Sequence, residues 1–381
     1  MSPALPSNWK SVLVTAALDE DRPIIRPTVK TAARDYREAG AFPIVDQSQN
    51  AIAGWTDNAA AVLRPARPVV VFGDHTRAFK YVDFPFATGA DGTLVLNPSL
   101  EFEPRFFYFA CLGLDIAARG YNRHYTMLKE MNVPKPPIDE QRKIAAILAK
   151  VQAAVAVEGD LVRVARELKQ AALRQLFTRG LRHEPQKQTT LGLVPESWDV
   201  VPVAECVTPF RFDRKQQVPA AAYSETGRFP IVDQGKQAIA GYCDDETKVI
   251  TPRPALIVFG DHTRCVKFVD FPFVLGSDGT KPLVAKPEWD ARTLFYALSS
   301  VDVESHGYNR HYKYLSEKLV ARSPDPAEQR EIAGLLATLD AKIAHHEARQ
   351  ALLRELFRTL LHDLLTARRR VTFLDPAALP S

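Results

Sequence analysis

Two short clusters of polar and basic side chains in this sequence are of the kind that contact nucleic acid. GDHTR stands at residues 73–77 and again at 260–264, and GYNRHY stands at 120–125 and again at 307–312. An arginine guanidinium can donate two hydrogen bonds to guanine, and threonine, histidine, asparagine and tyrosine can reach base edges or phosphates. The sequence therefore predicts DNA contacts by His75, Thr76, Arg77, Asn122 and Arg123, and by their counterparts His262, Thr263, Arg264, Asn309 and Arg310.

Two further pairs of residues extend this predicted contact set. Gln47 and Gln234 close a duplicated FPIVDQ segment, and a glutamine amide can pair with adenine in the major groove. Lys80 and Lys267 place a positive charge beside each GDHTR segment, which favours contact with phosphate.

A structural role competes with DNA contact for part of both clusters. Asp and Gly are typical turn residues, so we expect Asp74 and Asp261 to cap the GDHTR turn. The alternative for the histidines is a hydrogen bond inside the domain. GYNRHY precedes a long helical segment, and bracing the domain against that helix is as good an interpretation as DNA contact. For Arg77 and Arg264 the sequence favours contact with DNA.

Motifs of known catalytic or cofactor chemistry are missing from the sequence. It has no GxGxxG, GxxxxGK[ST], HExxH or GxSxG segment, and no Asn/Asp-Pro-Pro-aromatic segment that would hold a flipped base. The duplicated Asp-His-Arg loops could act as general acid and base, but no separate nucleophile is duplicated with them. We therefore predict a chain that is not an enzyme and has no catalytic residues.

The cysteines and the bulk composition indicate a reduced, soluble, cytoplasmic protein. The four cysteines show no CxxC pairing and no histidine at metal-ligand spacing, so neither disulfides nor a metal site is expected. No apolar run of about eighteen residues predicts a membrane span, and the segment MSPALPSNWK lacks the features of a signal peptide. A net charge of +4 means that any nucleic-acid surface must be a local gathering of Lys and Arg.

The elements that must position these clusters occur twice. FPIVDQ, AIAG, VFGDHTR, DFPF and GYNRHY all return after 187 residues, so one domain has been duplicated. Two copies cannot form a solenoid, which needs at least three repeats. PVVVFG at 68–73 and ALIVFG at 255–260 are typical of buried strands, and ADGT and SDGT carry a turn signal. Each GDHTR segment should therefore lie on the loop after a buried strand.

A long amphipathic helix is predicted after each copy. From Glu140 to about Arg179, and from Glu328 to about Arg370, apolar residues recur at helical spacing. DPAE at 325–328 offers an N-cap, a proline at the first helical position and a glutamate for a capping box. Helices of about forty residues extend about 60 Å, so we expect them to pair as an antiparallel coiled coil. The alternative is that each helix folds back onto its own domain.

The expected fold is α/β (α+β), with two duplicated globular domains separated by two long antiparallel helices. The predicted boundaries are 1–138 for the first domain, 139–182 for the central helix, 183–325 for the second domain, 326–370 for the C-terminal helix and 371–381 for a tail.

This order of segments resembles the DNA-specificity subunit of type I restriction–modification systems over essentially the whole chain. The openers LPSNW at 5–9 and VPESW at 194–198 are similar to that family's. So are EQRKIAAILAKV at 140–151 and EQREIAGLLATL at 328–339. VFGDHTR, DFPF and DGT resemble segments of one group of the family's target-recognition domains.

The resemblance implies a non-catalytic subunit whose two domains, 1–138 and 183–325, are target-recognition domains that each read half of a split DNA target. The paired helices would set the spacer between the half-sites. Implied partners are double-stranded DNA, two DNA adenine methyltransferase subunits and, where the system cleaves DNA, translocating nuclease subunits. S-adenosylmethionine, Mg²⁺ and ATP would bind those partners, and this chain would carry no cofactor. The cellular role would be restriction–modification and defence against phage.

The duplication sharpens the expected target. In the family the two domains lie in inverted relation on the duplex, so like loops predict a palindrome or near-palindrome interrupted by a spacer. Differences between the copies, such as Ser48 against Gly235 and Ala78 against Cys265, would spoil the symmetry. Two other classes of function compete with this one: a helical scaffold that binds proteins without reading DNA, and a hydrolase that uses the duplicated Asp-His-Arg loops.

Overall fold

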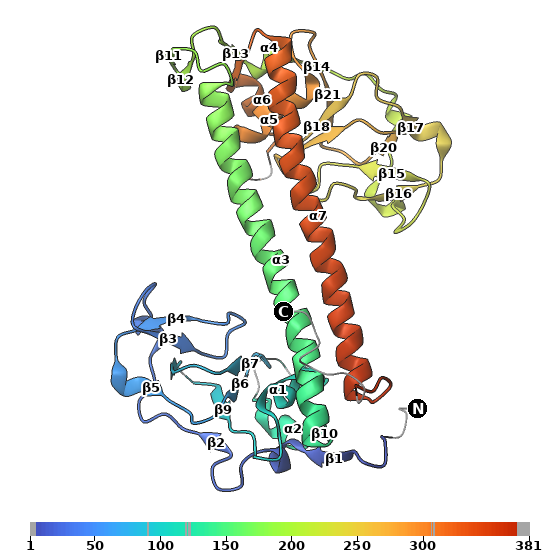
Figure 1. Cartoon of the computed structure of the whole chain (residues 1–381). Helices are drawn as coiled ribbons and strands as arrows, with labels where there is room; N and C mark the ends of the chain where they lie inside the picture. The colour runs from blue at the N-terminus through green and yellow to red at the C-terminus, as the bar shows by residue number, and fades with distance from the viewer. Residues whose placement is uncertain are drawn as a thin grey trace. The chain divides into compact units, whose positions relative to one another are not determined.

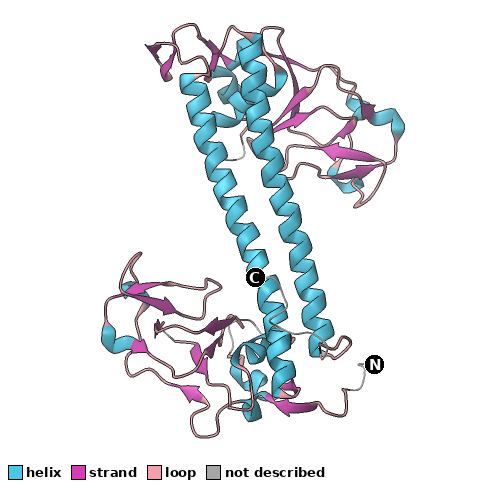
Figure 2. Ribbon diagram, viewed as in Figure 1, coloured by secondary structure: helices cyan, strands magenta, loops and turns pink. Residues whose placement is uncertain are grey.

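The computed structural model describes residues 5–89, 91–118, 120, 123–305, 307 and 309–371 (Figure 1). The chain forms two compact units. Unit 1 comprises the described residues up to Gly159 and from Ala348 onward, and unit 2 comprises Asp160–Glu347. The two long helices, α3 (Ile138–Arg179) and α7 (Pro326–Leu365), each contribute to both units (Figure 2). No helix among the described residues has an apolar stretch that would cross a membrane.

Unit 1 contains two four-stranded sheets and a separate two-stranded one. The first sheet has the strand order β2-β9-β6-β7, the second has β4-β3-β8-β5, and β1 pairs with β10. The strands are β1 (Lys10–Leu13), β2 (Ile24–Ile25), β3 (Phe42–Val45), β4 (Gly54–Thr56), β5 (Val62–Leu63), β6 (Val69–Gly73), β7 (Phe79–Val82), β8 (Phe86–Thr88), β9 (Thr93–Leu96) and β10 (Asn132–Lys135), with helices α1 (Pro104–Leu112) and α2 (Tyr125–Lys129) and 3-10 turns at Val14–Ala17, Ala33–Asp35 and Ala59–Ala61.

Unit 2 repeats this plan. Its sheets have the orders β14-β21-β18-β19 and β16-β15-β20-β17, β13 pairs with β22, and β11 and β12 form an additional hairpin. The strands are β11 (Gln186–Thr189), β12 (Gly192–Pro195), β13 (Asp199–Pro202), β14 (Val207–Pro209), β15 (Phe229–Val232), β16 (Gly241–Cys243), β17 (Val249–Ile250), β18 (Leu256–Gly260), β19 (Val266–Val269), β20 (Phe273–Leu275), β21 (Thr280–Ala285) and β22 (Leu319–Arg322), with helices α4 (Val203–Cys206), α5 (Ala291–Ser300) and α6 (Tyr312–Glu317) and 3-10 turns at Arg214–Gln216, Ala220–Ala222 and Glu246–Lys248.

The strand before each GDHTR segment is buried along its whole length, as the apolar runs predicted. Every residue of β6 and of β18 is buried, because each strand lies between two antiparallel neighbours and its alternate side chains enter two different hydrophobic cores, one on each face of the sheet. A fully covered strand favours continuous β-branched and aromatic residues rather than alternation. The loop that follows each strand is therefore held on a rigid support.

The long helices run antiparallel within each unit, which confirms the predicted coiled-coil pairing. In unit 1 the Gln350 side chain donates to the Val155 carbonyl (3.2 Å), and Arg349 pairs with Glu158 (3.0 Å). In unit 2 Lys169 pairs with Asp340, and Leu173 and Leu176 of α3 share a core with Ile332 and Leu336 of α7.

The alternative, in which each helix folds back onto its own domain, is wrong, because the continuous helices pair with each other; each nevertheless also packs on a domain. The start of α3 enters the core of unit 1 through Ile144 and Leu148, where it meets Phe106 of α1 and Leu364 of α7. Helix α7 ends at Leu365, five residues before the expected end. Ala367 adopts a left-handed backbone conformation (φ 55°) that breaks the helical path, as is common at helix C-termini.

The duplicated openers and EQR segments meet in the structure. The indole of Trp9 donates to Glu140 (3.0 Å), and that of Trp198 donates to Glu328 (3.1 Å). Both carboxylates are buried. Asp325 caps α7 by accepting from the Ala327 amide (2.8 Å), as predicted. The predicted capping box is wrong, because the Glu328 carboxylate is used by Trp198 and by other groups instead of the Asp325 backbone.

Candidate functional site

Four duplicated segments, distant in sequence, converge at one place in each unit, which we call the loop cluster. In unit 1 it comprises residues 46–48 after β3, 74–78 between β6 and β7, 91–92 before β9 and the described residues of 120–125 before α2. Unit 2 builds its loop cluster from 233–235, 261–265, 278–279 and the described residues of 307–312. The structure therefore brings together the segments from which the sequence predicted DNA contacts.

Asp74 joins the segments of the first loop cluster. Its amide donates to the Gly92 carbonyl (2.7 Å), and its carboxylate accepts from the Tyr125 amide (2.7 Å) at the start of α2. Its carbonyl accepts from the His124 amide (2.9 Å) and from His124 Nδ1 (2.8 Å). Asp74 and His124 are both buried. The expectation that Asp74 caps its own turn is wrong: its carboxylate instead accepts the first amide of α2, and His124 braces the domain.

The second loop cluster repeats this arrangement closely. Asp261 donates from its amide to Gly279 (2.7 Å) and accepts the Tyr312 amide on its carboxylate (2.8 Å). The Asp261 carbonyl accepts from the His311 amide (2.8 Å) and ring (2.9 Å). Agreement at this level means that the two clusters present their identical exposed residues on equivalent scaffolds.

The predicted adenine readers, Gln47 and Gln234, tie the loops together. Gln47 donates to the Asp91 carbonyl (3.0 Å) and accepts from the His75 amide (3.3 Å). Gln234 makes the same pair of bonds with Asp278 (2.9 Å) and His262 (3.1 Å). The hydroxyls of Thr76 and Thr263 donate to the carbonyls of these glutamines. Contact of these four side chains with DNA stays a prediction. It would require them to give up hydrogen bonds within the loops for hydrogen bonds to DNA.

Arg77 and Arg264 have the geometry of presented side chains. Both have a left-handed backbone (φ 62° and 63°), a strained conformation for a non-glycine residue that is typical of functional loops. Each guanidinium donates one bond to a backbone carbonyl, that of Ile116 or Val303, at 2.7 Å. Both residues are exposed. Since a guanidinium carries five N–H donors, each keeps donors for a base edge or phosphate.

Lys80 and Lys267 point into the domain. Their ammonium groups donate to the carbonyls of Asp46 (2.7 Å) and Asp233 (2.8 Å) and lie 3.6 and 3.5 Å from the carboxylates of the same residues. Burial lowers the pKa of both lysines, and the aspartates partly offset this effect. Their contact with phosphate stays a prediction that would require these pairs to open.

The remaining predicted residues lie in the GYNRHY segments. Arg123 and Arg310 are exposed, and so is Asn309. Asn122 lies outside the described residues. Arg123 Nε lies 4.0 Å from Asp74 Oδ2, whereas in unit 2 the group near the equivalent carboxylate oxygen is Lys281 Nζ, at 3.8 Å. The prediction missed Lys281. The signal was a difference between the two copies, because the residue of the first copy that aligns with Lys281 is Leu94.

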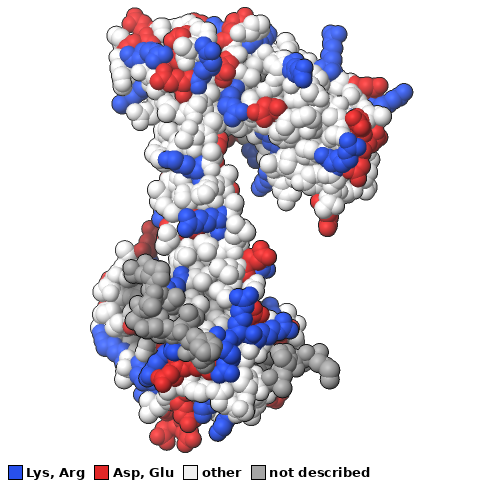
Figure 3. Space-filling view, turned by 45° about the vertical axis from the view of Figure 1, so that its right-hand side comes forward, with Lys and Arg blue, Asp and Glu red and all other residues white. Residues whose placement is uncertain are grey.

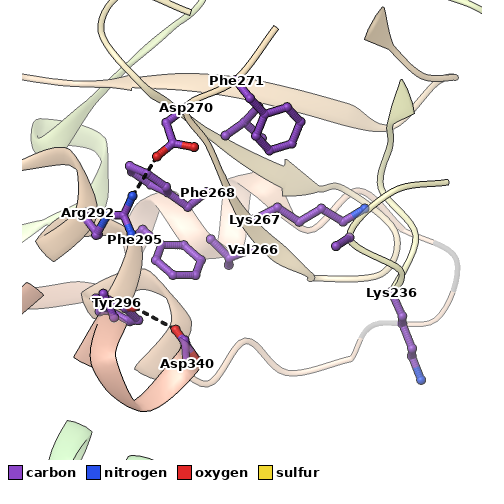
Figure 4. A pocket seen from close by; sticks show the side chains of 13 residues that line it. Lys236, Val266, Lys267, Phe268, Asp270, Phe271, Arg292, Phe295, Tyr296 and Asp340 are labelled. Atoms are coloured by element: carbon purple, nitrogen blue, oxygen red, sulfur yellow. Dashed lines mark hydrogen bonds and ion pairs between the residues drawn. The ribbon is translucent and has the colours of Figure 1, made fainter. Parts of the chain in front are cut away.

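A groove lies beside each loop cluster. In unit 2 it has a volume of about 450 Å³ and is bounded by β19, α5 and α7 (Figure 4). Arg292 pairs with Asp270 (2.7 Å) and lies over the Phe268 ring, and Tyr296 donates to Asp340 (2.7 Å). The groove of unit 1, about 530 Å³, is lined by residues at matching positions. The walls are largely aromatic, and Lys267, Asp270, Arg292, Tyr296 and Asp340 of the unit 2 groove are held by hydrogen bonds or ion pairs.

Charged side chains are mixed on the surface of the described chain. Lys and Arg side chains are interspersed with Asp and Glu on the face seen in Figure 3, without one continuous basic patch. Among the described residues, no group of three or more His, Cys, Asp or Glu side chains is placed to hold a metal ion. DNA contact would therefore depend on local groups such as the loop-cluster arginines.

Comparison with known proteins gives relatives in both sequence and fold. No protein-family model matches the sequence. The MjaX specificity subunit assigned to a type I restriction enzyme of Methanocaldococcus jannaschii is 25% identical over 273 residues, 67% of this chain and 64% of that relative, slightly less than two thirds of its length. The MjaVIII type I restriction enzyme specificity subunit of the same organism is 30% identical over 82 residues, 21% of this chain and 19% of the relative.

A solved structure shares the fold over nearly the whole chain. The crystal structure of the type I restriction–modification S subunit from M. genitalium superimposes with a TM-score of 0.68 and covers 96% of this chain and 98% of its own. The sequence identity is 17%, so this likeness is evidence of a common fold.

Proposed function

We propose that this chain, which belongs by sequence and fold to the specificity subunits of type I restriction–modification systems, is the non-catalytic subunit that reads DNA for such a complex. The observation that carries the proposal is the loop cluster, built twice with the same buried anchors and the same exposed arginines. A reader of a two-part target needs two equivalent, rigidly supported reading surfaces, and this chain has one in each unit.

The arginines of each loop cluster are the leading candidates for base contact. Arg77 and Arg264 are exposed and use one donor each on a backbone carbonyl. Arg123 and Arg310 lie in the segment that Asp74 or Asp261 anchors. A bidentate contact between arginine and guanine is the commonest specific contact in the major groove. His75, Thr76 and Gln47, with their counterparts, then shape the loop and can add contacts to phosphate.

The long helices would set the distance between the two half-sites. Helices of 42 and 40 residues extend about 60 Å at 1.5 Å per residue, and antiparallel pairing resists a change in that length. The proposed partners are double-stranded DNA, two DNA adenine methyltransferase subunits and, where cleavage occurs, translocating nuclease subunits. S-adenosylmethionine, Mg²⁺ and ATP would act on those subunits, and the complex would work in the cytoplasm.

The test of this function is selective DNA binding by the chain together with its methyltransferase subunits. Replacing Arg77 or Arg264 with alanine should weaken binding to the target about five- to a hundredfold and relax preference at one base pair. Arg37→Ala is the matched control, since its guanidinium pairs with Asp57 outside the loop cluster. Equal binding of all duplex sequences by the wild-type complex would favour the scaffold role instead.

The target itself should be a near-palindrome. The two loop clusters carry identical GDHTR and GYNRHY segments on matching supports, so each should prefer similar bases. Dimeric readers with like surfaces in inverted relation bind inverted half-sites. Genome-wide mapping of the methylated adenines is the measurement, and two unrelated half-sites would contradict this part of the proposal.

A further inference from the structure

We propose that Lys281 makes the two loop clusters unequal readers of DNA, because it occupies the buried carboxylate of Asp261 and leaves Arg310 available for a base or phosphate. The inference rests on the proposed function and names a specificity-determining residue for it. In unit 1 the corresponding arginine, Arg123, lies beside Asp74 instead.

The inequality arises at a single aligned position in the central sheets. Leu94 of β9 lies opposite Phe72 of β6 and packs against the core of unit 1. The aligned residue of β21 is Lys281, opposite Phe259 of β18. Its side chain is 40% exposed, and its ammonium lies 3.8 Å from Asp261 Oδ2. One strand residue thus brings to the second loop cluster a cation that the first lacks.

Each buried aspartate favours one nearby cation. The side chains of Asp74 and Asp261 are 8% and 1% exposed, and Oδ1 of each accepts a backbone amide. A buried carboxylate without compensation is costly, and the second oxygen is stabilised by a positive charge within about 4 Å. In unit 1 the nearby cation is Arg123, and in unit 2 it is Lys281.

Arg310 is consequently left without such a partner. It is exposed, and none of its side-chain atoms makes a hydrogen bond or an ion pair within the described part of the chain. Arg123, by contrast, lies beside the Asp74 carboxylate, whose negative charge competes with DNA for its guanidinium. Because only Arg123 has an interaction within the domain that competes with DNA, Arg310 should contribute more to DNA binding than Arg123 does.

A substitution series in the complex of this chain with its methyltransferase subunits tests the inference. We expect Arg310→Ala to weaken binding to the methylation target about tenfold, as for the loss of a base contact. We expect Arg123→Ala to weaken it about threefold or less, because its modest ion pair with Asp74 offsets part of what that arginine gains on DNA. Lys281→Leu, which installs the residue of the first copy, should free Asp261 to hold Arg310. In the Lys281→Leu background, Arg310→Ala should then weaken binding by only about threefold, as Arg123→Ala does.

The double substitution separates a specific coupling from simple loss of charge. If Lys281 acted only as another phosphate contact, the effects of Lys281→Leu and Arg310→Ala on affinity would multiply, which would overturn the inference. Equal losses for Arg123→Ala and Arg310→Ala would overturn it as well. Either of these outcomes would overturn the inference about Lys281 while the wild-type complex still binds DNA selectively, so the proposed function would stand. A wild-type complex without sequence preference would instead contradict the proposed function on which the inference rests.

Discussion

At the scale of single residues, buried aspartates hold the loops that carry the residues predicted to contact DNA. Asp74 and Asp261 each tie their own segment to two other segments of a loop cluster through hydrogen bonds with the backbone. Gln47 and Gln234 add a second tie. Polar residues that looked alike in the sequence therefore divide into those that build the loop and the exposed arginines that it presents.

Loss of an anchor should cost both stability and DNA binding. Asp261→Ala leaves the Tyr312 amide at the start of α6 without its acceptor, and we expect a fall of about 1–3 kcal/mol in the free energy of unfolding. Urea denaturation measures this change. Asp91→Ala is the control, because its carboxylate is 94% exposed and the substitution keeps the carbonyl that Gln47 binds. Equal stability of the two variants would contradict the anchoring role.

The four cysteines should divide into two reactive and two protected thiols. Burial raises the pKa of Cys206 to about 11 and raises that of Cys111 further. A raised pKa means that the thiolate is scarce at pH 8 and becomes more abundant only as pH approaches that value. Cys243 and Cys265 are half-buried. Titration with a disulfide reagent at pH 8 should show two fast thiols, with the other two reacting on unfolding, and four equal rates would contradict this burial.

At the scale of elements, apolar periodicity in the sequence correctly predicted two long helices and their antiparallel pairing. It did not predict which apolar residues face the partner helix and which face a domain. Leu336 is fully buried in the core shared by α3 and α7, whereas its neighbour Leu335 is 48% exposed. Helical spacing defines a stripe, but packing against several surfaces decides how each residue in that stripe is used.

These adjacent leucines make a matched test of the helix pairing. Leu336→Ala should lower the free energy of unfolding by about 2–5 kcal/mol, because it leaves a cavity between the helices and the domain. Leu335→Ala should change it by less than about 0.5 kcal/mol, as is usual for exposed sites. Thermal or urea denaturation measures both. Similar effects of the two substitutions would mean that the pairing face of α7 has been misassigned.

At the scale of the whole molecule, the helix starts are secured by residues from distant parts of the chain. Arg370, after α7, donates to Glu140 at the start of α3 (2.7 and 2.9 Å), and Glu140 also accepts the Trp9 indole. In the second copy Glu328 receives Trp198, the Leu181 amide and Ser323 instead. The basic run at 368–370 thus includes two residues with structural partners: Arg370 pairs with Glu140, and Arg369 pairs with Asp363 (3.2 Å).

Removal of this contact should destabilise unit 1. Arg370→Ala leaves the nearly buried Glu140 carboxylate without its cation, and we expect a loss of about 1.5–3 kcal/mol, as for a hydrogen bond to a charged group. Arg368→Ala, at an exposed neighbouring position, is the control. Calorimetry should show a lower melting temperature for the first variant alone. Unchanged melting of Arg370→Ala would show that Trp9 suffices to hold Glu140.

The sequence by itself determined the duplication, the strand before each GDHTR loop and the two long helices, because these follow from local spacing and backbone preference. Tertiary structure decided which of the duplicated polar residues are available. Lys80 and Lys267 face half-buried aspartates, the glutamine amides join loops, and Arg123 and Arg310 differ although their hexapeptides are identical. Availability depends on partners far away in the chain, such as Lys281 beside Asp261, and sequence spacing does not encode those contacts.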